Sequence, residues 1–116
     1  MDYLQINKMQ FHAFHGVYEQ ENKIGNTYIV DLKLGANYNN ACKSDKLEDS
    51  INYASVFDEV KSVMNIPCKL IEHLAENICS RLKSKFPQIQ TIEIKVTKKN
   101  PPISGQIESV SIILFR

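Results

Sequence analysis

The sequence predicts an α+β fold in which a four-stranded antiparallel sheet carries two helices on one face, in the order β-β-α-α-β-β. Three patterns predict it. Residues 26–38 alternate strictly between apolar and polar side chains, as a half-buried antiparallel strand does. Residues 53–64 and 69–85 instead repeat apolar side chains at helical spacing. Segments 3–14, 91–97 and 107–115 return to a period of two and supply the other strands.

The first strand and the loop after it depart from a simple hairpin. In segment 3–14 the apolar alternation changes sides between Ile6 and Met9, which predicts a β-bulge. Residues 15–25 are too many for a tight turn between the first two strands. We therefore expect this loop to carry function rather than only to connect the strands.

The helices have recognisable start and stop signals. Asn52 or Ser50 can cap the first helix, and Pro67 prevents its continuation. Pro87 ends the second helix, on whose apolar stripe Cys79 is expected to be a core residue. A sheet of this size leaves two edges with unpaired backbone groups, so we expect the chain to assemble symmetrically with copies of itself.

Length and composition fit one cytoplasmic domain spanning residues 1–116. Fourteen basic and thirteen acidic residues leave a net charge of +1, which favours neither nucleic acid nor a membrane surface as a partner. No apolar run approaches the ~20 residues of a membrane span, and the first residues lack the pattern of a signal peptide. The three cysteines are scattered, without a C-x-x-C pair, which favours a reduced protein over a disulfide framework or a zinc site.

Several segments together resemble one family, dihydroneopterin aldolase of folate biosynthesis. They cover nearly the whole chain in the right order, and they are Phe14-His15-Gly16, residues 21–25 leading into Val30-Asp31, Asn52-Tyr53-Ala54, residues 70–76 and residues 96–105. The resemblance implies the tunnelling fold, in which subunits join their sheets into an oligomeric barrel with the helices outside. It also implies a homotetramer or homo-octamer with active sites at the subunit interfaces.

The reaction implied by the resemblance is a retro-aldol cleavage. Its substrate is the pterin 7,8-dihydroneopterin, and its products are 6-hydroxymethyl-7,8-dihydropterin and glycolaldehyde. The dihydropterin ring has its own C=N group to accept the electrons of the broken bond, so neither a lysine Schiff base nor a metal is required, and no cofactor is expected. The protein has to supply orientation and proton transfers. The same chemistry allows epimerisation at C2′.

The resemblance also implies roles for five residues. Glu72, in the first turn of the second helix, anchors the pterin with help from the main chain of Ile71. Lys98 is the general acid/base, and Glu21 interacts with it and with the substrate side chain. Tyr53 joins the pterin pocket from the adjacent subunit and returns a proton to the intermediate. On pattern alone these residues can also be a first-turn acid, a strand-end charge, a loop charge and a helix anchor.

Other readings remain open at this stage. A dihydroneopterin triphosphate 2′-epimerase would need a basic triphosphate pocket, and the sequence shows no clear basic cluster near Glu21. A non-catalytic module that binds pterins or purines would need only Glu72 and a stacking surface, and a purely structural assembly protein would need neither. His12, His15 and His73 include no H-x-H pair, so we expect no metal site, and His15 is expected to be a turn or core residue.

Overall fold

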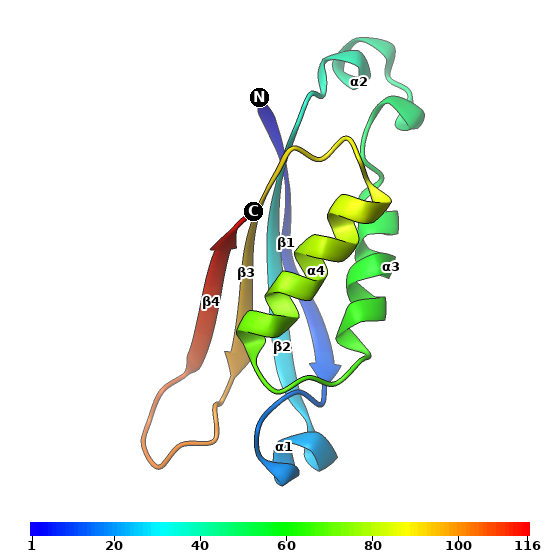
Figure 1. The fold of residues 1–116 in the computed structure, drawn as a ribbon. Coiled ribbons are helices and arrows are strands. Elements are labelled where there is room, and N and C mark those ends of the chain that lie inside the picture. The colour runs from blue at the N-terminus through cyan, green and yellow to red at the C-terminus, as the bar shows by residue number, and fades with distance from the viewer.

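The computed structural model describes residues 1–116 and confirms the predicted four-stranded antiparallel sheet with two long helices on one face (Figure 1). Each strand pairs with its neighbour in sequence, in the order β1-β2-β3-β4. The elements in chain order are β1 (Asp2–Ala13), α1 (Glu19–Ile24), β2 (Asn26–Ala36), α2 (Asn39–Ser44), the 3-10 turn η1 (Leu47–Asp49), α3 (Tyr53–Met64), α4 (Ile71–Lys85), β3 (Thr91–Lys99) and β4 (Ser109–Phe115).

The prediction of only two helices is wrong. The long loop after β1 contains the short helix α1, and α2 with η1 follows β2. The helices α1 and α2 have six residues each, too few to show an apolar repeat in the sequence. β2 also ends at Ala36 rather than at residue 38. Just after this end, the Asn37 side chain accepts a hydrogen bond from the Asn39 N–H at 2.9 Å, at the start of α2.

The core lies between the sheet and the two long helices. α3 and α4 lie side by side over the sheet, with α3 against β1 and α4 against β3 and β4 (Figure 1). Every second residue of β2 faces the helices and is buried, as the alternation predicts. The largest side chains that meet in this layer are Tyr28, Leu34, Met64, Leu74, Ile78, Leu82, Ile92 and Ile94.

The predicted bulge in β1 is confirmed. Ile6 lies opposite Leu32, but the next pair joins Met9 to Val30, so β1 carries one extra residue there. Lys8 has a φ of 56° and donates its N–H to Asp31 Oδ1 at 2.9 Å. Beyond the bulge the odd-numbered residues of β1 face the helices.

β3 is longer than predicted, which corrects the position of Lys98. The sequence pattern ends this strand at residue 97 and leaves Lys98 beyond it. In the structure Lys98 is paired inside the sheet, opposite Tyr28 of β2 and Val110 of β4. The Asn26 side-chain amide donates to the Lys99 carbonyl at 2.5 Å and ties the ends of β2 and β3 together.

The long helices match the prediction closely. α3 spans the predicted residues, and Asn52 caps it by accepting the Ala54 N–H at 2.9 Å. α4 begins at Ile71, two residues later than predicted, and ends before Pro87. None of the helices combines the length and apolarity needed to cross a membrane.

Figure 1 shows which segments share an end of the sheet. The C-terminal end of β3, the helix α1 and the first turn of α4 lie together at one end, which we call the α1 end. The first turn of α3 lies at the opposite end, beside η1 and α2 (Figure 1).

Candidate active site

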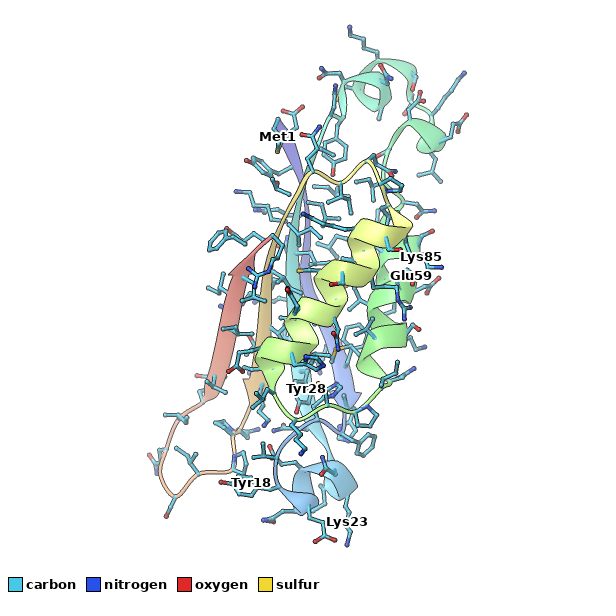
Figure 2. All side chains as sticks on the ribbon, viewed as in Figure 1. Met1, Tyr18, Lys23, Tyr28, Glu59 and Lys85 are labelled. Atoms are coloured by element: carbon cyan, nitrogen blue, oxygen red, sulfur yellow. The ribbon has the colours of Figure 1, made fainter.

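A buried ion pair joins Glu21 and Lys98 at the α1 end of the sheet. Lys98 Nζ contacts Glu21 Oε1, and the two side chains are 13% and 6% exposed. Lys98 comes from β3, on the face that the helices cover, and Glu21 comes from α1. Tyr18 and Tyr28, labelled in Figure 2, lie at this end. The structure therefore brings together two residues that are far apart in the sequence and that were predicted to act as a pair.

Backbone groups hold the Glu21 carboxylate from its other side. Its Oε2 accepts the N–H of Tyr18 at 3.1 Å, across the first turn of α1. Burial by itself raises the pKa of Glu21, but the Lys98 hydrogen bond, the N–H groups of Tyr18 and Val17, and the Lys98 charge together outweigh burial and lower that pKa. Glu21 is therefore a carboxylate rather than a carboxylic acid at neutral pH.

This pKa shift predicts how acid affects stability. Because the pKa of Glu21 is lower in the folded chain than its ordinary 4.5, the ionised group stabilises the fold above that pH. The stabilisation is lost as the pH falls through the lower, folded-state value. We expect Glu21→Gln to lower the free energy of unfolding at neutral pH and to flatten its decline in acid, measured by urea unfolding. The exposed Glu19 is the control, and Glu19→Gln should leave the curve nearly unchanged.

Gly16 makes room for the Glu21 carboxylate. Its φ is +143°, and a Cβ at this position would lie 2.3 Å from Glu21 Oε2. Only glycine combines this backbone conformation with that close approach.

We expect Gly16→Ala to destabilise the fold by at least about 1–3 kcal/mol, the usual scale of such backbone strain. It should also lower activity, because the Glu21 carboxylate has to move. Gly105→Ala is the matched control, since the nearest atom to its added Cβ would be 3.7 Å away, an ordinary contact. Thermal unfolding of both variants checks this, and equal melting temperatures would contradict it.

The loop that carries Glu21 is fastened to the segment before α4. The Gly16 N–H donates to the Cys68 carbonyl at 2.9 Å, and the Cys68 N–H donates to His15 Nδ1 at 3.0 Å. The Asn22 side-chain amide closes the loop by donating to the carbonyls of Phe14 and Gly16 at 3.0 and 3.1 Å. These bonds hold Glu21 beside the start of α4.

Glu72 and Ile71 occupy the first turn of α4, as predicted. Leu74 donates to the Leu70 carbonyl at 3.1 Å, and the N–H groups before it have no partner within the helix. Glu72 is exposed and Ile71 half-buried. A carboxylate at this position can accept from the N–H edge of a flat ring, while a free backbone N–H beside it donates to a carbonyl of the same ring.

The structure does not bring Tyr53 to the other predicted residues within one chain. Tyr53 is the first residue of α3 and is 66% exposed. It lies at the end of the sheet opposite the α1 end (Figure 1). A helix of twelve residues spans about 18 Å, so Tyr53 is separated from the Glu21–Lys98 pair by roughly the length of α3.

Two grooves of the single chain lie away from the predicted residues. One groove of about 480 Å³ runs between α3 and α4, and its lining residues include Pro67, His73 and Arg81. Another of about 450 Å³ lies at Tyr3 and Phe115. Neither contains Glu21, Lys98, Tyr53 or Glu72.

The sequence predicted no functional role for His15, Gly16 or Asn22. These three residues shape the loop that holds the Glu21 carboxylate. His15 and Gly16 do stand in one of the segments that carry the family resemblance. The signal for Gly16 was its position at the start of an unusually long loop, where a positive φ is common. Asn22 stands in another of these segments, residues 21–25, but nothing in the sequence indicated its hydrogen bonds within the loop.

The fold and the paired groups define a small α+β protein with a buried ion pair at one end of its sheet. A family model described as dihydroneopterin aldolase matches residues 4–115. The chain is 38% identical to the dihydroneopterin aldolase of Staphylococcus epidermidis, with 99% of this chain and 96% of that protein aligned. It is also 38% identical to the Bacillus subtilis protein of that name, over 100% of this chain and 98% of that protein.

Solved structures agree. The dihydroneopterin aldolase of E. coli, in complex with neopterin, superposes with a TM-score of 0.91 at 26% identity, covering 100% of this chain and 99% of that one. The chain belongs to the dihydroneopterin aldolase family, a family of lyases, which confirms the resemblance found in the sequence.

Proposed function

We propose that the chain cleaves 7,8-dihydroneopterin by a retro-aldol reaction in folate biosynthesis, acting as a single cytoplasmic domain. The observation that carries the proposal is the buried Glu21–Lys98 pair beside the start of α4. Two charged groups held in fixed geometry can move a proton at a defined atom. The neopterin bound to the E. coli relative supports a pterin as the substrate class.

The first turn of α4 binds the pterin ring. The Glu72 carboxylate accepts hydrogen bonds from the ring N–H and the exocyclic amine of the pterin, and the main chain at Ile71 assists. Charge-assisted bonds of this kind contribute about 1.5–3 kcal/mol each.

The Glu21–Lys98 ion pair carries out the proton transfer. Lys98 acts as its neutral amine, after its ammonium has passed a proton to water, and, oriented by Glu21, takes the proton of the substrate's 2′-hydroxyl. The C2′–O bond becomes a carbonyl, the bond between C1′ and C2′ breaks, and its electron pair moves into the C=N group of the dihydropterin ring. Glycolaldehyde leaves, and a proton delivered to C1′ through Tyr53 completes the product. Every electron stays within the substrate, so the mechanism needs no cofactor, metal or Schiff base.

The assembly completes the site. We propose that the chain forms a homotetramer or homo-octamer whose subunits extend each other's sheets through the free edges of β1 and β4. Tyr53 of one subunit then joins Glu21, Lys98 and Glu72 of the next. The separation of Tyr53 from these residues within one chain supports a site built from two copies.

One assay tests the reaction. The purified protein is incubated with 7,8-dihydroneopterin in EDTA, and glycolaldehyde is measured. Release of glycolaldehyde in EDTA is the expected result. Faster turnover of the triphosphate would indicate the 2′-epimerase instead, and pterin binding without conversion would indicate a binding module.

A mixing experiment tests the shared site. Lys98→Ala and Tyr53→Ala are each expected to be inactive, and mixed assemblies are formed by unfolding and refolding the two variants together. If each site takes Lys98 and Tyr53 from different copies, about a quarter of the mixed sites are intact. Activity should therefore return on mixing, and a mixture as inactive as either variant would contradict the proposal.

A further inference from the structure

His15 lies in the loop that carries Glu21 and contacts the segment before α4 and the strand paired with β3, yet the mechanism above gives it no role. Its side chain is 1% exposed. Ring Nδ1 lies 3.0 Å from the backbone nitrogen of Cys68, just before α4. A backbone N–H can only donate, so Nδ1 is the acceptor and the neutral ring carries its proton on Nε2.

A second bond runs in the opposite direction between the same two segments. The Gly16 N–H donates to the Cys68 carbonyl at 2.9 Å. We call these two hydrogen bonds, which join residues 15 and 16 to Cys68, the His15–Cys68 clamp. On one side of the clamp the chain leads from Gly16 into the loop and helix α1 that hold Glu21. On the other side it leads within a few residues to Ile71 and Glu72.

His15 is also tied to the strand pair that holds Lys98. Its carbonyl accepts the Tyr28 O–H at 2.8 Å. Its ring packs edge-on against the Tyr28 ring, with the centroids 5.1 Å apart. Tyr28 lies directly opposite Lys98 in the β2–β3 ladder. The clamp therefore has a fixed position relative to Lys98 as well.

The second ring nitrogen suggests that stability alone does not explain this histidine. Nε2 is buried, and the Met64 backbone is its neighbour in a geometry looser than that of an ordinary hydrogen bond. A buried polar group that is poorly paired destabilises a fold, a cost that an apolar side chain would avoid. Poorly satisfied groups of this kind are uncommon in folded proteins and call for a specific explanation.

We propose that His15 is a positioning residue for the aldolase reaction, whose imidazole holds the Glu21–Lys98 pair and the start of α4 at a fixed separation. The pair and the Glu72 carboxylate then engage the same substrate molecule, one at its side chain and the other at its ring. This inference rests on the proposed function, because it assigns His15 to that reaction.

Two amide substitutions test the role of Nδ1. In His15→Asn the side-chain oxygen lies as many bonds from Cβ as Nδ1 does, so it can accept the Cys68 N–H. In His15→Gln the amide carbon occupies that position and the side-chain oxygen lies one bond further from Cβ, so the acceptor at the Nδ1 position is lost. We expect His15→Gln to lower kcat/KM by about 10- to 100-fold, the cost of slightly misplaced reacting groups, and to weaken neopterin binding. His15→Asn should recover most of both, and equal activity of the two folded variants would overturn the proposal.

Hydrogen exchange gives a readout that does not depend on activity. His15→Gln should lose protection in residues 16–22 and 68–73 together, whereas protection in β4 stays unchanged and His15→Asn restores both segments. Unchanged protection would overturn the clamp. If neither variant folds, ¹⁵N NMR of the wild-type imidazole decides, because a proton on Nδ1 is incompatible with the clamp. Absence of dihydroneopterin cleavage by the wild type would instead refute the proposed function. The hydrogen-exchange experiment would still test the His15–Cys68 clamp.

Discussion

Replacing Lys98 with alanine is expected to slow cleavage of 7,8-dihydroneopterin by about 10²- to 10⁴-fold, the usual contribution of a positioned general acid or base. The ammonium group is nearly buried against Glu21, so no exposed side chain is in a position to replace it. Binding of neopterin should persist, because the first turn of α4 is untouched. Single-turnover rates together with a neopterin titration separate the two effects.

The neighbouring lysine is the control for Lys98. Lys99 is adjacent in β3, but its side chain is 36% exposed and its contact with Glu108 is long, at 3.8 Å. Lys99→Ala should therefore leave the rate nearly unchanged. Lys98→Ala also leaves Glu21 buried without its partner, which destabilises a fold by about 3–5 kcal/mol, so rates are compared at a temperature where circular dichroism shows both variants folded. A folded Lys98→Ala variant with the wild-type rate would reject the assigned role.

Replacing Glu72 with alanine is expected to act on binding. Loss of two charge-assisted hydrogen bonds, each contributing about 1.5–3 kcal/mol, should weaken neopterin binding by about 100-fold or more. The fold should tolerate the change because Glu72 is exposed. Equilibrium titration followed by pterin fluorescence measures the loss.

Glu76, one turn further along α4, is the matched control for Glu72. It is an exposed carboxylate on the same helix, and it pairs with Arg116 at 2.8 Å. Glu76→Ala removes the same charge and should leave neopterin binding unchanged. Similar weakening in both variants would mean that the helix charge in general, rather than Glu72 in particular, attracts the pterin.

The repeating patterns predicted the regular parts of the fold well. The alternation of β2 and the apolar stripes of α3 and α4 reflect burial of one face, which constrains every second or every third to fourth residue. The short helices α1 and α2 bury no such stripe, so the sequence contained no signal for them. The extent of β3 was missed for a related reason, since pairing of Lys98 and Lys99 depends on β2 and on the Asn26 side chain.

The candidate site was predicted only through the family resemblance. Spacing alone could not show that Glu21 meets Lys98, because that contact depends on the fold of the loop around Gly16. The separation of Tyr53 from the pair was likewise invisible in the sequence, since it depends on the direction in which α3 runs along the sheet. The role of His15 as a junction between segments became visible only from the partners of its Nδ1 atom and its carbonyl.

The bulge in β1 decides which way His15 points. Beyond Lys8 the inward side chains have odd numbers, and Met9, Ala13 and His15 are all buried. An uninterrupted strand would keep the parity of Leu4 and Ile6, turning Phe14 inward and His15 to solvent. Deleting Lys8 would shift each later residue by one position and leave Met9 opposite Val30, whereas one residue inserted between Met9 and Ala13 would turn His15 outward and release the Glu21 loop from a position in the middle of the strand.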